Sequence, residues 1–337
     1  MGPIAKGGDN VSKSILITGG AGYIGSHAVI AFLEADFNVV VLDDLSTGVR
    51  KSVATNAEFI EGNAGDEALV GQIIQDHDIE GVIHFAGSLI VPESVTDPLK
   101  YYRNNTCVSR NLIETCVRTG VGRFVFSSTA AVYGISEHVP VTEDVATLPI
   151  NPYGWSKLMT ELILKDAAAA HPFSYMALRY FNVAGADPGG RVGQSTPGAT
   201  NLIKVACEVA AGTRDCLDIF GDDYDTPDGT GVRDYIHVTD LVNAHVDAYR
   251  GLEKDGQSAV LNCGYGHGYS VRDVVAAVES ETGTSLSVAV APRRAGDPAE
   301  MTADSTKVRE NYGWQPRYDD LHFIVRTALD WERGLTK

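Results

Sequence analysis

The chain lacks several features that mark other classes of protein. Only five of its 337 residues are cysteine, at positions 107, 116, 207, 216 and 263, and they form neither a Cys-x-x-Cys pair nor a metal-ligand spacing with the nine histidines. Its apolar runs fall well short of the roughly 18 residues that span a bilayer, and its first residues carry no hydrophobic signal region. A disulfide framework, a metal centre and a membrane anchor are therefore not predicted, and reduced thiols in the cytoplasm are expected.

Basic residues are also few relative to acidic ones. The chain has 27 Lys and Arg residues against 44 Asp and Glu residues, which gives a formal net charge of −17 and an isoelectric point of about 4.8. Such a surface does not attract polyanions over long range, so neither nucleic acid nor an anionic membrane is expected as a partner. An anionic ligand would have to be held by individual basic side chains in a local site.

The chain does contain a glycine-rich turn close to its start. In the segment SILITGGAGYIGSH, residues 14–27, an apolar run precedes Gly19, Gly22 and Gly25, and a helical pattern follows. Glycines there let the backbone turn tightly and approach a pyrophosphate, which would lie at the helix N-terminus. The next apolar run ends at Asp43, roughly 20 residues downstream, where a ribose-binding acid is expected. Because Asp43 would repel a 2′-phosphate, the pattern predicts NAD rather than NADP.

Short apolar runs alternate with amphipathic stretches over the first half of the chain. This alternation predicts an α/β fold with a doubly wound parallel sheet of the Rossmann type. Beyond about residue 182 Asp, Pro and Gly become abundant, and a smaller α/β substrate-binding domain is expected there. Strands are expected over 58–60, 81–85, 123–128 and 175–180, and a helix over 108–117 that ends at Gly120.

These patterns divide the chain into three expected parts. The polar, glycine-rich residues 1–13 are interpreted as a flexible leader outside the fold. Residues 14–181 are expected to form the NAD-binding domain, to which a segment at about 236–263 returns. Residues 182–337 are expected to form mainly the substrate-binding domain.

A tyrosine and a lysine lie four positions apart in the run NPYGWSK. On a helix this spacing places Tyr153 and Lys157 on one face, so the ammonium can lower the pKa of the phenol and make it a general base. Thr129 follows an apolar strand pattern, and its hydroxyl would emerge at the carboxyl end of that strand, where open parallel sheets bind ligands. Together these side chains could relay a proton from a substrate alcohol beside a nicotinamide. Taken singly, each is equally compatible with a structural role.

Several longer blocks, in order along the chain, connect it to a known family. They are TGGAGYIGSH at 18–27, HFAG at 84–87, YYRNN at 101–105, RYFN at 179–182, DGTGVRDYIHV at 228–238 and APRRAGD at 291–297. With these blocks the chain resembles the extended short-chain dehydrogenase/reductase family, and in particular its UDP-sugar 4-epimerases, from about residue 14 to the C-terminus.

The resemblance implies a set of site residues, with Thr129 and Tyr153 in catalysis and Lys157 in support. Contacts with NAD are implied at Gly22, Tyr23, Ile24, Asp43, Asn63, Phe85, Ala86, Asn104 and Tyr180, as well as at the tyrosine and the lysine. Contacts with the nucleotide sugar are implied at Asn182, Asn201, Leu202, Phe220, Arg233, Tyr235, Arg294 and Asp297. The two arginines could neutralise a diphosphate and the phenylalanine could cover a uracil; ion pairs and core packing are the alternatives.

The implied activity interconverts UDP-glucose and UDP-galactose by epimerisation at C4, through a transient 4-keto sugar nucleotide and with a tightly bound NAD that is recycled. A homodimer is implied as well. The alternatives are a 4-epimerase for UDP-xylose or UDP-arabinose, UDP-glucuronate or UDP-N-acetylglucosamine, a nucleotide-sugar dehydratase, and an NAD-binding regulator. A regulator would be expected to lack Tyr153 or Lys157. A dehydratase needs a further acid, whereas Ala130 and Ala131 follow Thr129 where related dehydratases carry Asp-Glu.

The chain departs from the family pattern at four positions. Asn63 stands where an aspartate is usual, so a weaker adenine contact is expected, and Leu89 replaces a lysine that many relatives place near the cofactor phosphates. Thr129 keeps the hydroxyl of the more frequent serine. Met301 occupies a position near the sugar that often holds tyrosine or a small residue, and its flexibility leaves acceptance of N-acetylated sugars open.

Overall fold

The computed structural model describes residues 13–196, 198–294 and 296–335, and its centre is a parallel sheet of seven strands. The spatial order is β11-β6-β5-β4-β1-β2-β3, and each neighbouring pair is parallel. This arrangement confirms the predicted doubly wound sheet. The strands are β1 Ser14–Thr18, β2 Asn38–Asp43, β3 Glu58–Glu61, β4 Ile79–His84, β5 Arg123–Ser127, β6 Ser174–Tyr180 and β11 Ala259–Cys263.

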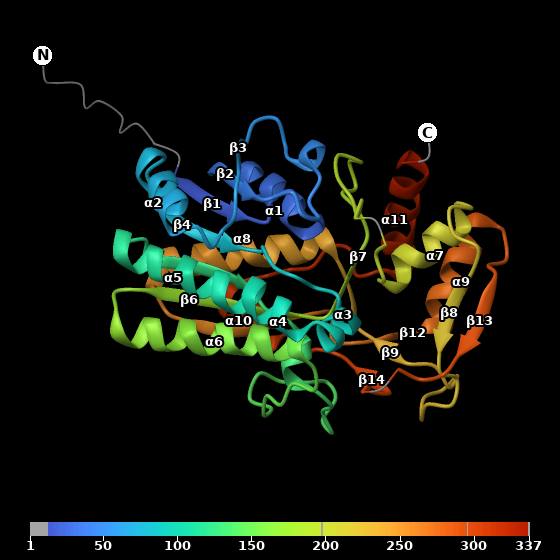
Figure 1. The fold of residues 1–337 in the computed structure, drawn as a ribbon. Coiled ribbons are helices and arrows are strands. Elements are labelled where there is room, and N and C mark those ends of the chain that lie inside the picture. Colours follow the sequence, from blue (N-terminus) through green and yellow to red (C-terminus); the bar gives the residue numbers. More distant parts are fainter. Residues whose placement is uncertain (1–12, 197, 295, 336–337) are drawn as a thin grey trace, which may run out of the picture.

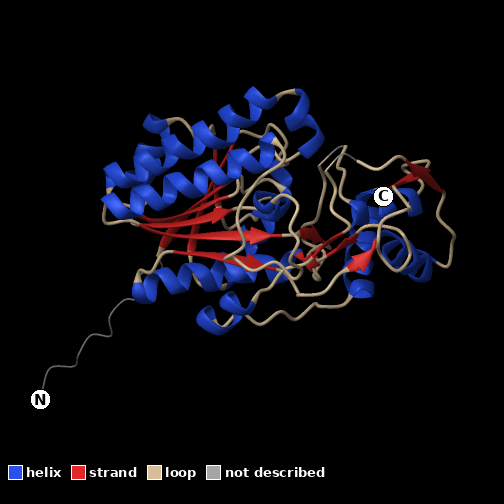
Figure 2. Cartoon of the chain, turned by 90° about the horizontal axis from the view of Figure 1, so that it is seen from below, coloured by secondary structure: helices blue, strands red, loops and turns tan. Residues whose placement is uncertain are grey.

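Helices cover both faces of this sheet (Figures 1 and 2). Alternate residues of β1 explain the layering, because Ile15 and Ile17 enter one core and Leu16 enters the other. The first core lies under α1 Tyr23–Glu34, α8 Val238–Asp255 and α10 Thr306–Tyr312. The second lies under α2 Glu67–Asp76, α5 Val108–Thr119 and α6 Pro152–Ala170.

The strands predicted from apolar runs are all present, with ends that differ from the predicted ones by up to two residues. Gly120 ends α5 with a φ of 83°, a left-handed conformation that glycine adopts without steric cost. Shorter elements connect the main ones: η1 Arg50–Ser52, α3 Val91–Thr96, α4 Pro98–Tyr101, the π-helical turn η2 Tyr102–Cys107 and η3 Ala130–Tyr133. The π-helical turn has no counterpart in the sequence-based prediction.

The order of the strands reverses at β1, which pairs with β2 on one side and with β4 on the other. Ligands of open α/β sheets bind outside the carboxyl ends of the strands at such a reversal. In this protein the carboxyl ends of β1 and β4 meet where Thr18 lies opposite His84. The glycine-rich turn follows β1 directly, so the fold places it at the expected ligand position.

From residue 182 onward most of the chain lies beyond the carboxyl ends of the large sheet (Figure 1). Its small sheets pair β7 with β10, β8 with β13, and β9 with both β12 and β14. The elements are β7 Asn182–Ala184, α7 Leu202–Ala210, β8 Leu217–Phe220, β9 Val232–Arg233, β10 Tyr235–His237, β12 Tyr269–Ser270, α9 Val271–Thr282, β13 Val288–Ala291, β14 Glu300–Met301 and α11 Leu321–Leu335.

Besides α10, which packs on β11, two further segments after residue 182 pack with the large sheet. Helix α8 packs on β5 and β6, and β11 extends the sheet by pairing Leu261 with Leu178. The leader predicted over residues 1–13 lies, apart from Lys13, outside the described residues. Within the described segments, no helix combines the length and the apolar character that crossing a membrane requires.

Candidate functional site

The glycine-rich turn packs directly against the end of β4. Gly19 has a φ of 73°, and a Cβ atom there would lie 2.6 Å from the backbone nitrogen of Ala86. A Cβ atom at Gly25 would lie 2.0 Å from the carbonyl oxygen of Gly19. Neither position tolerates a side chain, so no side chain at these glycines covers the start of α1. Helix α1 begins at Tyr23 after Gly22, and its N-terminus is open toward a ligand.

Asp43 links the end of β2 to this turn. Its carboxylate accepts hydrogen bonds from the backbone nitrogens of Ala21 at 2.9 Å and Leu45 at 2.8 Å. The residue is 7% exposed, and burial raises its pKa, although the two backbone donors oppose that shift. The predicted ribose acid therefore also fixes the shape of the turn.

Other predicted cofactor residues surround the same strand ends. The hydroxyl of Tyr23 donates to the carbonyl oxygen of Gly185 at 2.7 Å, so this side chain ties α1 to the loop after β7. The amide of Asn63 donates to Asp44 at 3.3 Å, beside β2. Asn104 lies in η2, and its amide donates to the hydroxyl of Ser88 at 3.2 Å. Ile24 and Phe85 are half-buried and pack against the core under α1 and α8.

The start of α6 is positioned by its cap and by a glycine. The Asn151 side chain accepts a hydrogen bond from the backbone nitrogen of Gly154 at 2.8 Å, which fixes the first turn. A Cβ atom at Gly154 would lie 2.7 Å from the carbonyl oxygen of Ala131, so helix and η3 approach closely. This contact brings Tyr153, in the first turn of α6, to Thr129, the residue that caps η3.

The phenol of Tyr153 is held in a largely desolvated position. Burial raises its pKa, and a hydrogen bond with the Thr129 side chain opposes that rise. This result differs from the sequence-based expectation that Lys157 lowers the pKa of the phenol. The desolvation of the phenolate outweighs the other influences in this structure.

Lys157 lies one helical turn further along α6 and is 5% exposed. Its ammonium donates to the carbonyl oxygen of Ser127 at 2.9 Å and lies 5.0 Å from the ring centroid of Phe126. Burial lowers its pKa to about 8. The Tyr180 hydroxyl forms a short hydrogen bond with the Ser127 hydroxyl, which brings that predicted cofactor residue to the end of β5 as well.

Two buried polar groups near this cluster were not singled out from the sequence. His84 bonds Thr18 through Nδ1 at 2.7 Å and Ser109 through Nε2 at 2.8 Å, and burial followed by the charge of Lys157 lowers its pKa to about 3. Asn105 in η2 donates to the hydroxyl of Ser156 at 2.9 Å, which joins the π-helical turn to α6. Both residues fall within the blocks that carried the resemblance, but their partners are distant in sequence.

The second region brings several predicted substrate residues together. Asn182 and Tyr235 are opposite each other in the β7–β10 pair. Arg233 lies in β9, between Tyr269 of β12 and Met301 of β14. Met301 is also part of the apolar cluster around η3 and the start of α6, which connects this small sheet to the Tyr153 region.

Arg233 and Arg294 carry charges that no carboxylate neutralises within the described residues. The Arg233 guanidinium donates to the carbonyl oxygen of Val232 at 2.8 Å, and that of Arg294 lies 3.7 Å from the ring centroid of Phe220. Neither forms a salt bridge with a described acidic residue. In a chain with 44 acidic residues, such free guanidinium groups are suited to an anionic ligand.

The remaining predicted substrate residues lie close to these groups or at the start of α7. Asp297 donates its backbone nitrogen to the carbonyl oxygen of Arg294 at 3.3 Å. Asn201 caps α7, where Leu202 is the first residue, and its side chain accepts from the Gln194 amide at 3.0 Å. The contacts of Asn201 and Leu202 given by the structure do not join them to the two arginines.

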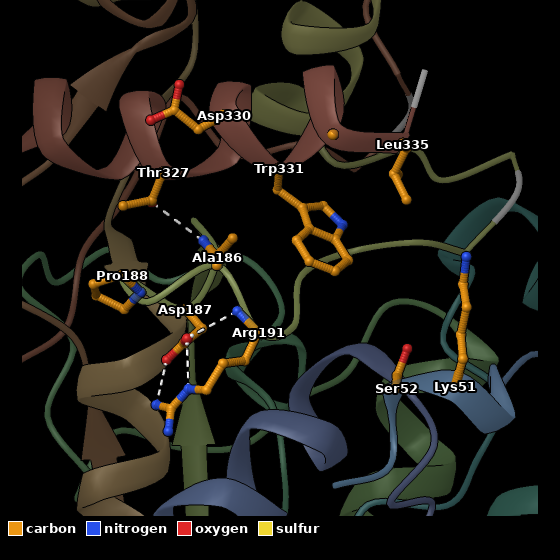
Figure 3. Close-up of a pocket in the computed structure, with 12 residues that line it drawn as sticks. Lys51, Ser52, Ala186, Asp187, Pro188, Arg191, Thr327, Asp330, Trp331 and Leu335 are labelled. Carbon is orange, nitrogen blue, oxygen red and sulfur yellow. Dashed lines mark hydrogen bonds and ion pairs between the residues drawn. The ribbon is translucent and has the colours of Figure 1, made fainter. Parts of the chain in front are cut away.

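A pocket of about 490 Å³ lies apart from these groups, between α11 and the loop after β7 (Figure 3). Arg191 in its wall donates to both carboxylate oxygens of Asp187. The positive charge of Arg191 is therefore already neutralised. Trp331 and Lys51 face the same space. None of the predicted site residues lines this pocket, and we do not assign it to the site.

Comparisons with known proteins identify the family of this chain. The model of the NAD dependent epimerase/dehydratase family matches residues 15–264. A UDP-glucose 4-epimerase of Azospirillum brasilense is 54% identical over 324 residues, covering 96% of this chain and 93% of its own. The UDP-glucose 4-epimerase of Brucella ovis, solved in complex with NAD, is 43% identical with a TM-score of 0.93, covering 96% and 99% of the two chains.

A further similar structure was solved with a nucleotide as well as the cofactor. The UDP-glucose 4-epimerase of Bifidobacterium longum, in complex with NAD+ and UDP, is 38% identical with a TM-score of 0.91, and 96% of this chain and 98% of that chain are covered. The glycine turn, the arrangement of Thr129, Tyr153 and Lys157, and these matches lead to one assignment. The chain belongs to the NAD dependent epimerase/dehydratase family.

Proposed function

We propose that this protein interconverts UDP-glucose and UDP-galactose by inverting C4 of the sugar. The observation that carries the proposal is the cluster at the end of β5, where Tyr153 meets Thr129 and Lys157 is bound to Ser127. It lies beside the glycine turn, at the carboxyl ends of a parallel sheet. The many relatives named UDP-glucose 4-epimerase that are similar over nearly the whole chain support this substrate class.

The turn after β1 fits NAD. The side-chain-free surface at Gly19, Gly22 and Gly25 admits a pyrophosphate to the start of α1, and the buried Asp43 offers remaining lone pairs to a ribose. Tyr180, bonded to Ser127, would border the nicotinamide end. When bound, NAD supplies a reversible hydride acceptor for C4 of the sugar.

The chain's own residues move one proton and hold the nucleotide. Tyr153 removes the proton of the 4-hydroxyl, and Thr129 orients that hydroxyl toward the phenol. Lys157 stabilises the phenolate through its positive charge. Loss of this proton, together with the C4 hydride that bound NAD would accept, gives a 4-keto nucleotide. After the sugar turns about its phosphate linkage, the hydride would return to the opposite face of C4 while Tyr153 gives the proton back.

Arg233 and Arg294 keep the nucleotide in place while the sugar turns. Both are free of acidic partners and can bind a diphosphate through charge-assisted hydrogen bonds. Phe220, already stacked with Arg294, provides a flat apolar surface next to a uracil. Firm binding of UDP and loose binding of the sugar together allow inversion without release of the keto compound.

The direct test is incubation of the purified protein with UDP-galactose and no added NAD. UDP-glucose is the expected product, and a cofactor released only by denaturation is expected to remain with the protein. A parallel assay with UDP-xylose, UDP-glucuronate and UDP-N-acetylglucosamine measures the preference. Turnover of another sugar with no reaction of UDP-galactose would replace the proposed substrate.

The proposed organisation follows from this chemistry. Residues 14–181, with the segment at about 236–263, would bind NAD, and residues 182–337 would mainly bind the UDP-sugar; the pairing of β11 with β6 supports the returning segment. The five cysteines are all free thiols, which supports a reducing compartment such as the cytoplasm.

A second copy of the chain is the proposed partner. Helices α3 and α4 pack against α6, and together they expose Val95, Leu99, Leu162, Trp155 and Met159. The first three are 63%, 73% and 51% exposed. Apolar side chains gathered on one face indicate a binding surface, and a self-complementary face produces a two-fold dimer.

A further inference from the structure

Helix α6 presents three polar side chains on one face at intervals of four residues: Tyr153, Lys157 and Glu161. The end of β5 presents three consecutive residues to that face. Tyr153 bonds the Thr129 side chain, Lys157 bonds the Ser127 carbonyl oxygen, and Glu161 accepts from the Ser128 hydroxyl. The helix and the strand end are therefore joined three times, and only two of these contacts involve the proposed catalytic groups.

The third contact belongs to a buried ion pair. Glu161 is 5% exposed and Arg179 of β6 is 6% exposed. The guanidinium donates through Nε and Nη2 to the two carboxylate oxygens at 3.0 Å and 2.6 Å. Such a two-pronged pair leaves the carboxylate with a fixed orientation, and the Ser128 hydroxyl is bound to it. Because burying two charges gains little stability over apolar packing, the value of the pair lies in the geometry that it imposes.

The same arginine fixes the far side of η3. Arg179 donates through Nη1 to the hydroxyl of Tyr133 at 3.0 Å, and that hydroxyl donates to Asn262 of β11 at 2.7 Å. Tyr133 is the last residue of η3, whose cap is Thr129. One buried group thus holds the chain immediately before and shortly after Thr129.

We propose that Glu161, Arg179 and Ser128 are positioning residues for the catalytic centre. The Ser128 hydroxyl, held by the ion pair, sets the position of the adjacent Ser127 carbonyl oxygen, which in turn holds the ammonium of Lys157 one helical turn beyond Tyr153 on the same face of α6. This inference rests on the proposed function. These three residues act through the end of β5.

The titratable groups that face the Tyr153–Lys157 pair come from three other elements. They are Tyr101 of α4, whose ring centroid lies 6.3 Å from that of Tyr153, His84 of β4 and Tyr180 of β6. His84 is neutral over the working range because its pKa is lowered to about 3. If a substitution at Ser128 changes the pKa of the Tyr153 phenol, that change therefore reports a change in the position of Lys157.

The test compares Ser128→Ala and Glu161→Gln with Thr160→Val in the full-length protein. Thr160 is fully buried on α6, and its hydroxyl bonds only within the helix, to the Ser156 carbonyl oxygen at 3.1 Å, which makes it a matched control. We expect kcat with UDP-galactose to fall about 10- to 100-fold in both test variants with KM within about threefold, since a misplacement near 1 Å has effects of this size. The control is expected to keep its kcat.

The pKa of the phenol gives a second readout that does not need turnover. The difference between the ultraviolet phenolate titrations of each protein and of its Tyr153→Phe counterpart isolates this one tyrosine. Ser128→Ala is expected to raise the pKa of Tyr153, because the Ser127 carbonyl oxygen no longer holds Lys157 in place on the Tyr153 face of α6. Thr160→Val should leave it unchanged.

The outcomes separate the two proposals. If the wild-type protein does not convert UDP-galactose, the proposed function fails, and the titration alone decides the positioning role. An unchanged pKa of Tyr153 in Ser128→Ala overturns the positioning role, as does a fall in kcat that matches a loss of folded protein measured by circular dichroism. Equal effects of Ser128→Ala and Thr160→Val would also overturn it.

Discussion

Burial acts in the same chemical direction on Tyr153 and Lys157, the two members of the proposed relay, because it favours the neutral form of each. It raises the pKa of the Tyr153 phenol and lowers the pKa of the Lys157 ammonium to about 8. The ionised phenol that abstraction of a proton requires therefore depends on groups that favour the charged form, which are the Thr129 hydrogen bond and positive charge on the same face of α6. Turnover should depend on the hydroxyl itself and on the placement of that charge.

Replacing the phenol tests the proposed base. Tyr153→Phe is expected to lower kcat by about 10²- to 10⁴-fold, the usual contribution of a general base, while the affinity for UDP is retained. Tyr101→Phe is the matched control, since its hydroxyl bonds protein groups, Ile90 and Glu93, and its loss should lower the melting temperature more than kcat. Steady-state kinetics measure kcat, and titration calorimetry measures the affinity for UDP, in both variants. Undiminished turnover of Tyr153→Phe would eliminate this tyrosine as the base.

Two neighbouring arginines allow the proposed ligand-binding charge of Arg294 to be compared with the structural charge of Arg293. Arg294 has no acidic partner among the described residues, whereas Arg293 donates to Asp223 at 2.5 Å and stacks over Tyr224 at 4.1 Å. Arg294→Ala is expected to weaken UDP binding about 10- to 100-fold, the value of charge-assisted hydrogen bonds, and Arg293→Ala by less than about threefold. Calorimetric titration with UDP measures the affinity of both variants. Equal losses of UDP affinity would show that Arg294 does not bind the diphosphate preferentially.

At the scale of an element, the glycine turn depends on the absence of side chains. Gly25→Ala would bring a Cβ atom to 2.0 Å from the Gly19 carbonyl oxygen and is expected to lower the melting temperature and abolish co-purification of NAD. Gly71→Ala, within α2, has only an ordinary contact with Thr115 at 4.0 Å and should stabilise the protein by about 0.5 to 1 kcal/mol. Thermal unfolding measures the melting temperatures of the two variants, and absorbance of the cofactor measures their NAD content. A stable, NAD-loaded Gly25→Ala protein would contradict the role of the turn.

Elements with local signals were predictable from the sequence. The turn after β1 and the end of α5 at Gly120 follow from glycine positions, and the strands of the large sheet follow from continuous apolar runs. The four-residue spacing also identified the helix face that carries Tyr153 and Lys157. Each of these features is determined within about ten residues of chain.

Features that depend on distant partners could not be predicted. The Ser127 carbonyl that binds Lys157 is 30 residues away from it, and its role depends on the packing of α6 on β5. The strands β9, β12 and β14 have two residues each, which is too short for any periodicity to show. The rise in the pKa of Tyr153 results from burial, which the spacing with Lys157 does not reveal.

For the whole molecule, buried histidines set the response to acid. Burial lowers the pKa of His84 and His237 to about 3 and of His27 and His245 to about 4, against 6.5 for an exposed histidine. The unfolded chain binds these protons first, so stability is present above pH 6.5 and is lost as the pH falls below it. Each histidine is expected to contribute up to about 1.4 kcal/mol per pH unit to this loss.

Denaturant unfolding between pH 7.5 and 5.5 measures the effect. Buried carboxyls such as Asp43 and Asp234, whose pKa values burial raises, act in the opposite direction and reduce the loss of stability wherever they titrate. The interval spans the ordinary pKa of histidine, so the histidines of the unfolded chain titrate within it. A free energy of unfolding that does not fall as the pH is lowered across this interval would contradict the expected net loss of stability from the histidines.

The exposed apolar face over α3, α4 and α6 predicts how two copies associate. In a two-fold dimer each substitution occurs twice across the interface, so Leu99→Glu combined with Leu162→Glu would bury four carboxylates against apolar side chains. We expect this double variant to sediment as a monomer of about half the wild-type mass. Val290→Glu on β13, which replaces a 56% exposed valine in the second region, should leave the dimer intact. A wild-type protein that sediments at the 36.0 kDa of one chain would assign the face to some other partner.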